Sequence, residues 1–117
     1  MTRVLRSHLQ NVAFSGLVLQ EILDRPLDDE TPQARLKEIG MMTVLYAMSQ
    51  AHQPLTLTNI SELLKLTRSG AKETVDLLVR RGLLNETMVK NSMGRGTARK
   101  FEISKELLDK LRSFDTE

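Results

Sequence analysis

The sequence predicts a mainly helical protein with one small β-hairpin. Apolar residues recur at intervals of three and four along most of the chain, which is the spacing of one helix face. Aromatic residues make up only 3% of the 117 residues, so Leu, Ile, Val and Met must fill the core. Two segments of alternating character flank a glycine-containing turn near the end, which indicates the hairpin. The length favours a single domain over residues 1–117.

Composition excludes several classes of function. The chain has no cysteine, so disulfides and thiolate metal sites are ruled out, and a cytoplasmic location fits. No apolar run approaches the roughly 18 residues that span a bilayer, so no membrane contact is expected. The two histidines are far apart in sequence, and no glycine-rich phosphate loop follows a strand. We therefore predict no enzyme activity, no cofactor and no metal site.

A long helix is predicted over residues 4–24. Its small and apolar side chains follow spacings of four and three and form one stripe: Leu5, Leu9, Val12, Gly16, Leu19 and Leu23. A second apolar set beside this stripe makes the apolar surface wider than one neighbouring helix would cover. The width predicts that this helix forms the interface of a homodimer. The alternative is that it packs lengthwise on its own domain.

A polar loop over residues 25–33 leads into a second helix, predicted over residues 32–51. Thr31 is placed to cap this helix, and Pro32 occupies the first helical position, where its missing N–H costs nothing. Leu36 and Ile39 begin its expected apolar face.

Two further helices follow with a very short connection between them. Thr58 is the expected cap of the first, whose apolar face is Ile60, Leu63 and Leu64. Thr67 is the expected cap of the second, which spans about residues 68–81. Its expected inner face is Ala71, Val75, Leu78 and Val79, and Gly82 ends it as a C-cap.

The hairpin is predicted from residues 83–91 and 98–104, with Gly94 and Gly96 in the turn. A final helix over residues 105–114 follows. Two closely connected helices and then a hairpin are the order of a winged helix-turn-helix, with its core at residues 55–104 and a long N-terminal helix in front.

Positive charge is concentrated in this core. Residues 65–100 hold nine Lys or Arg and three acidic residues, a formal charge of +6, which leaves −4 for the remainder. A basic face of this kind is typical of phosphate binding, whereas the simpler interpretation is a solvated charged face.

Double-stranded DNA is therefore the expected partner, with the helix over residues 68–81 in the major groove and the hairpin on backbone or minor groove. The predicted contacts on the helix are Thr67, Arg68, Ser69, Gly70, Lys72 and Glu73. The predicted contacts on the hairpin are Lys90, Arg95, Arg99 and Lys100. Gly70 is expected to permit close approach of the backbone. The wing sequence NSMGRGTAR holds no acidic residue, so it offers no local carboxylate to anchor Arg95 or Arg99.

The segments TNISELL, TRSGAKETVDLLVRRGLL and FEIS, in this order and with the basic wing between the last two, resemble the MarR-type winged-helix transcriptional regulators over about residues 55–104. The resemblance implies a symmetric dimer that binds DNA and regulates transcription. It also allows a small-molecule effector site at Met41, Met42 and Met48, for which core packing is the alternative. The competing functional hypothesis is a winged helix that binds another protein and no DNA.

Overall fold

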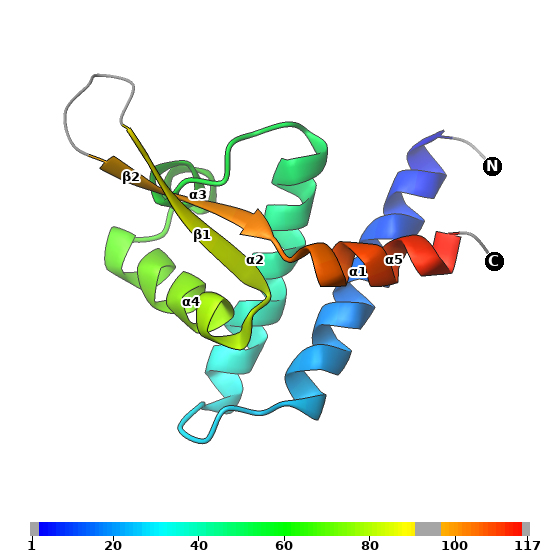
Figure 1. Ribbon diagram of the computed structural model, residues 1–117, viewed down its shortest axis with the longest axis horizontal. Helices are drawn as coiled ribbons and strands as arrows, with labels where there is room; N and C mark the ends of the chain where they lie inside the picture. Colours follow the sequence, from blue (N-terminus) through cyan, green and yellow to red (C-terminus); the bar gives the residue numbers. More distant parts are fainter. Residues whose placement is uncertain (1–2, 91–96, 116–117) are drawn as a thin grey trace.

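The computed structural model describes residues 3–90 and 97–115, with side chains described over residues 9–90 and 98–113. Its elements follow in this order: α1 (Arg3–Asp24), α2 (Pro32–Gln50), α3 (Leu57–Leu64), α4 (Arg68–Arg81), β1 (Leu84–Lys90), β2 (Thr97–Ile103) and α5 (Lys105–Asp115). The predicted class, mainly helical with one antiparallel hairpin in a winged helix-turn-helix, is confirmed (Figure 1). None of the helices in these ranges has the length and hydropathy needed to cross a lipid bilayer.

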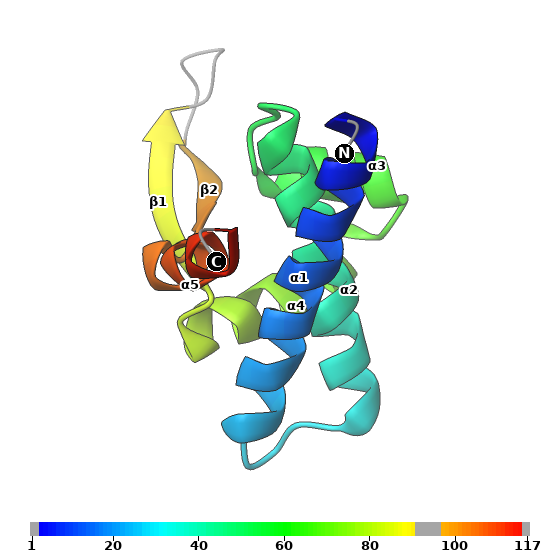
Figure 2. The ribbon, with the colours of Figure 1, turned by 90° about the vertical axis from the view of Figure 1, so that its right-hand side faces the viewer.

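Helices α1 and α2 run antiparallel and share the core. The rings of Phe14 and Tyr46 stack between them, with centroids 4.3 Å apart, and the hydroxyls of Ser15 and Thr43 lie 2.9 Å apart beside the rings. Helix α5 packs on the other side of α1 (Figure 2), where Lys110 donates a hydrogen bond to Glu21. The core is therefore filled mainly by aliphatic side chains and Met, as the composition predicts.

Helix α2 packs differently from the prediction at its start. Leu36, expected on the inner face, is 70% exposed, because the buried face of α2 begins instead at Glu38 and continues through Met41 and Met42. Together with Met48, these methionines are buried among core residues. Core packing therefore accounts for all three.

The start of α3 corrects a predicted cap. Thr56, which has an extended backbone, is the N-cap, and its hydroxyl accepts a hydrogen bond from the backbone N–H of Asn59 at 3.2 Å. Thr58 already lies within the helix, where a threonine cannot cap the first turn. Leu63, predicted to face the core, is 53% exposed, whereas Ile60 is fully buried.

Helix α4 agrees closely with the prediction. The Thr67 hydroxyl accepts from the backbone N–H of Gly70 at 3.1 Å, and Gly82 ends the helix with a φ of 80°. Glycine adopts this left-handed backbone conformation at little cost in free energy, because it has no Cβ. Ala71, Val75 and Leu78 are fully buried, so one face of α4 is held against the core and the opposite face is available.

The hairpin is fixed at its base. In the register of the two strands, Leu84 pairs with Ile103 and Glu86 with Phe101. Leu84, Phe101 and Ile103 are buried, and the backbone N–H of Phe101 donates to the carbonyl of Leu55 at 2.8 Å. This bond ties the base of the wing to the segment that leads into α3, so the wing and the helix-turn-helix form one packed unit.

Candidate nucleic-acid interface

The outer face of α4 carries the predicted helix contacts. Arg68, Ser69, Lys72 and Glu73 are all exposed, and they lie on the N-terminal half of the helix at one end of the molecule (Figure 1). Thr67 precedes them as the cap. The structure thus places these residues side by side on the accessible surface of the second helix of the helix-turn-helix.

Gly70 has a structural reason to be glycine. A Cβ added at this position would lie 3.0 Å from the hydroxyl oxygen of Thr67, the same oxygen that caps the helix. A larger residue would therefore disturb the cap at the point where α4 begins. Close approach of the Gly70 backbone to DNA stays a prediction.

Arg99 on β2 holds two carboxylates. Its Nε donates to Glu86 Oε2 at 2.8 Å and its Nη2 to Glu86 Oε1 at 2.6 Å, a two-point contact between neighbouring strands. Nη2 also donates to Asp76 Oδ1 on α4 at 2.7 Å. The guanidinium lies 5.1 Å from the centre of the Phe101 ring. Arg99 therefore connects both strands of the wing to α4.

For Arg99, this network corrects the expectation that no carboxylate anchors the wing arginines. The register explains how Glu86 reaches Arg99: Arg99 pairs with Met88, so Glu86 is its diagonal neighbour on the same face of the hairpin. Diagonal neighbours lie within reach of long side chains. Pairing the two predicted strands would have revealed Glu86 from the sequence, whereas Asp76 required the packing of α4 against the wing.

The same network sets the charge state of its acids. Partial burial of Asp76 raises its pKa, but hydrogen bonds from Lys72 and Arg99 outweigh this and hold the pKa below its ordinary value. Hydrogen bonds from Arg99 lower the pKa of Glu86. Both carboxyl groups are therefore ionised at neutral pH, and Lys72, whose Nζ lies 2.9 Å from Asp76 Oδ2, is paired as well.

Four basic residues in residues 65–100 form no ion pair within the described part of the chain: Lys65, Arg68, Lys90 and Lys100. Arg68 and Lys90 are exposed, and Lys100 is half-buried. These side chains are the cations most accessible to a phosphate. Arg95 lies outside the described residues, so its predicted contact at the wing tip stays a prediction.

Two arginines counted in the basic segment are neutralised by acids from elsewhere. Arg81 binds Glu30 and Glu38, and Arg80 lies 3.6 Å from Asp29. Without these two, the segment has seven basic and three acidic residues, so the excess remains positive but falls to +4. The sequence count overstated the positive charge of this face, because it covered residues 65–100 only and the acidic partners lie about 40 to 50 residues earlier in the chain.

Helix α1 has two apolar faces. Phe14, Leu17, Val18 and Ile22 are buried in the core. The stripe predicted for dimerisation is exposed on the other face: Leu9 by 49%, Val12 by 70%, Leu19 by 42% and Leu23 by 59%, with open space beside Gly16. The side chain of Leu5 lies outside those described. An apolar stripe of this length is thus left uncovered by the described residues.

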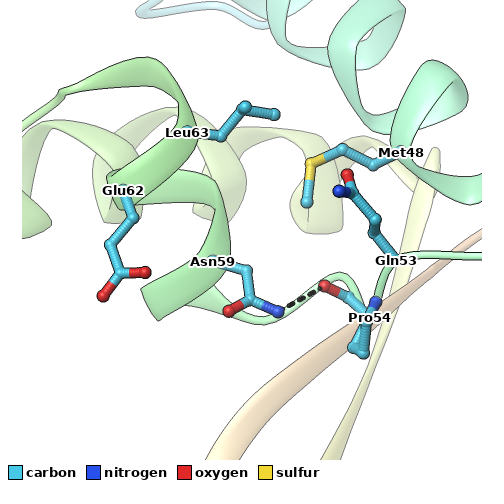
Figure 3. Close-up of a pocket in the computed structure, with 6 residues that line it drawn as sticks. All are labelled: Met48, Gln53, Pro54, Asn59, Glu62 and Leu63. Carbon is cyan, nitrogen blue, oxygen red and sulfur yellow. Dashed lines mark hydrogen bonds between the residues drawn. The ribbon is translucent and has the colours of Figure 1, made fainter. Parts of the chain in front are cut away.

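A surface groove lies between α2 and α3, with a volume of about 430 Å³. Met48 from α2 and Leu63 from α3 lie on either side of it (Figure 3). The amide of Asn59 donates to the carbonyl of Pro54 at 3.0 Å, which uses one polar group of the wall internally. Within the described ranges, no group of three or more His, Cys, Asp or Glu residues is placed to hold a metal ion.

Comparison with known proteins gives one structural match. No protein-family model matches the sequence, and no curated protein matches it. The crystal structure of the adhesin competence repressor from Streptococcus pyogenes aligns with a TM-score of 0.41 and 19% identity, covering 96% of this chain and 73% of that one. The helices and hairpin of this chain itself therefore define its fold.

Proposed function

We propose that this chain is a transcriptional regulator of the MarR-like type that binds double-stranded DNA with sequence specificity as a homodimer. The observation that carries the proposal is the exposed row Arg68, Ser69, Lys72 and Glu73 at the start of α4. In a helix-turn-helix the first turns of the second helix reach the base edges of the major groove. Buried Ala71, Val75 and Leu78 hold this helix firmly from behind.

The proposed roles follow from exposure and charge. Arg68 and Lys72 reach bases and phosphates, Ser69 and Glu73 contact base edges, and the hydroxyl of Thr67 lies beside the first phosphate. Lys90, Arg95 and Lys100 bind backbone or minor groove from the wing. Arg99, which already holds Glu86 and Asp76, fixes the wing relative to α4 before DNA arrives. A regulator of this kind acts where the DNA is, in the cytoplasm of a bacterial cell.

The homodimer is proposed through α1. Its exposed stripe of Leu9, Val12, Leu19 and Leu23 is apolar over about four helical turns, and exposed apolar surfaces of this kind mark interaction sites. A second copy of the same helix presents a matching stripe, so a two-fold symmetric contact would bury both at once. Helix α1 lies on the side of the molecule away from α4 and the wing, so a contact through α1 would leave these free for DNA (Figure 1).

DNA binding is tested by fluorescence anisotropy with duplexes from the region upstream of the gene and with random duplexes, at a fixed salt concentration. Arg68→Ala and Lys72→Ala should each weaken specific binding by about 1 to 3 kcal/mol if the side chain reaches a base, and random binding by less. Arg112→Ala, an exposed arginine on α5, is the matched control and should bind as the parent does. Absence of duplex binding at low salt would favour the protein-binding alternative instead.

The dimer is tested by sedimentation velocity. The unmodified chain should sediment as a dimer at tens of micromolar, and Leu9→Glu or Leu19→Glu should yield monomers because a charge would be buried in the contact. Leu63→Glu, an equally exposed leucine on α3, should leave the dimer intact. A monomer in every variant would refute the proposed assembly.

A further inference from the structure

The last turn of α4 ends in a buried ionic cluster. The side chain of Arg81 is only 4% exposed, and the side chains of Glu30 and Glu38 are fully buried. Arg81 Nε donates to Glu38 Oε1 at 2.6 Å, and its Nη2 donates to Glu30 Oε1. Its Nη1 donates to the backbone carbonyl of Arg25 at 2.6 Å. One guanidinium thus joins α4 to α2 and to the segment between α1 and α2.

Other charged groups around the cluster are few and identifiable. Arg35 on α2 donates to Glu30 Oε1 at 3.1 Å and is one-third exposed. Arg80 on α4 lies near Asp29 at the surface. On the α1 side, Glu21 and Arg25 line the cavity next to Arg81, and Glu21 is itself bound by Lys110 of α5. Within the described residues, Arg81 is the only cation in contact with Glu38.

Two buried acceptor atoms of the cluster have no donor within the described ranges. Glu30 Oε2 and Glu38 Oε2 are both buried without a hydrogen-bond partner among the described residues. An unpartnered charged oxygen is costly in a protein interior, and a proton on one of the two carboxyl groups removes that cost. Two carboxyl groups beside one arginine therefore favour holding a single shared proton.

The proton is held by Glu38. Burial raises the pKa of Glu38 to about 7, and the neighbouring Glu30 carboxyl adds to the rise. Burial also raises the pKa of Glu30, but its hydrogen bonds with Glu38, Arg81 and Arg35 outweigh this and keep that pKa below its ordinary value. Near neutral pH, Glu30 is ionised and Glu38 changes its charge.

We propose that Glu30, Glu38 and Arg81 form a proton-dependent latch that holds the C-terminal end of α4 against α2, so that duplex binding depends on pH in the neutral range. With the proton in place, the cluster holds one carboxylate and one neutral carboxyl group, and α4 is fixed. Loss of the proton leaves an additional negative charge in the interior, which loosens the attachment of α4. The inference for DNA binding rests on the function proposed above, whereas the inference for α4 does not.

The first experiment measures stability without DNA. Thermal unfolding of the unmodified chain should show a falling melting temperature between about pH 5 and about pH 7, because the folded state there binds a proton that the unfolded state releases. Glu38→Gln, which mimics the neutral carboxyl, should flatten this slope. Glu106→Gln, which neutralises an exposed carboxylate on α5, should retain it, and both variants keep the two histidines. An equal slope in Glu38→Gln and the unmodified chain would overturn the latch.

The second experiment measures duplex affinity on either side of neutrality. The unmodified chain should lose roughly three- to tenfold in affinity from about pH 6 to about pH 8, whereas Glu38→Gln should change less than about twofold. If the stability slope depends on Glu38 but no duplex binds at either pH, the latch stands and the proposed function fails. If duplex binds with the same pH dependence in both proteins, the coupling of the latch to DNA is wrong.

A measurement on the unmodified chain covers the case in which Glu38→Gln does not fold. Carbon-13 NMR of the glutamate side chains should show one carboxyl group that titrates near pH 7. If every glutamate carboxyl group titrates below about pH 5, the interior holds no such proton and the latch is refuted.

Discussion

Two arginines in this protein each bind two carboxylates, and each joins α4 to another part of the fold, but in opposite surroundings. The side chains of Arg81 and its partners Glu30 and Glu38 are at most 4% exposed. The side chain of Arg99 is 23% exposed, and those of Glu86 and Asp76 are 26% and 40% exposed. The first cluster lies in the interior at the end of α4, and the second lies at the surface between α4 and the wing.

Water makes the difference between the two clusters. In the interior, each charge has lost its hydration, so removing one partner leaves the others without compensation. At the surface, water and salt replace a missing partner, and the same interactions contribute little to stability. A buried cluster can therefore fix the position of a helix, whereas an exposed one can exchange a carboxylate for a phosphate at small cost.

The largest expected effect is at Arg81. Arg81→Met should lower the free energy of unfolding by about 3 to 5 kcal/mol, because Glu30 and Glu38 would then be buried with no arginine between them. Urea denaturation followed by circular dichroism measures this. Adding Glu30→Gln and Glu38→Gln to the same chain should recover most of the loss, since no unpaired charge remains. Failure to recover would show that Arg81 acts through packing alone.

The second prediction concerns the opposite pH dependence of the two clusters. The folded-state pKa of Glu38 is raised, so its contribution to stability, about 3 kcal/mol at most, is lost as pH rises from about 4.5 to about 7. The pKa of Glu86 is lowered by Arg99, so its contribution is present above its ordinary pKa and is lost as pH falls through the lowered value.

Unfolding free energies measured from about pH 3 to about pH 8 test these two opposite dependences. Glu86→Gln should reduce the loss of stability at acid pH and leave unchanged the loss of stability as pH rises towards neutral. Glu38→Gln should do the reverse. If either substitution changes the other side of the profile, the two clusters are coupled through α4 and do not act independently.

The fold could be predicted from the sequence because its signals are local. Thr31, Thr67 and Gly82 mark helix ends by chemistry that acts within one turn, and all three do so in the structure. Thr56 and Thr58 show the limit of such local signals. Both are followed by a helical pattern, and only the extended backbone of Thr56 makes it the cap.

The candidate site was predictable in its positions but only partly in its electrostatics. Helical periodicity predicts the exposed row on α4, because the residues between the buried positions of a helix lie on its opposite face. The carboxylates that bind Arg81 come from another helix and a loop, and no local pattern indicates them. Tertiary packing alone decides which of the basic residues stay available for a phosphate.

The third prediction concerns Arg99. Arg99→Met should lower the free energy of unfolding by about 1 kcal/mol, because it removes the two-point interaction with Glu86 and the cation over Phe101. The loss stays small because water can hydrate the partly exposed carboxylates that remain. The cost should shrink in about 1 M salt, because salt screens charges that are exposed to solvent and screens buried pairs much less. The cost of Arg81→Met should persist at that salt concentration. Equal salt sensitivity would contradict the assignment of one cluster to the interior and the other to the surface.

The smallest expected effect is at Lys72, at the edge of the Arg99 network. Lys72 and Asp76 are 58% and 40% exposed and lie one helical turn apart, so Lys72→Met should change the free energy of unfolding by only about 0.3 to 0.5 kcal/mol. Duplex affinity should nevertheless fall, because this side chain lies on the proposed groove-facing row. Urea denaturation and anisotropy on the same samples separate the two effects. Arg112→Met, also in an exposed pair within one helix, should match the small change in stability without any loss of affinity. If both variants bind DNA equally well, Lys72 serves only to pair with Asp76, and the proposed interface must shift towards Arg68 and the wing.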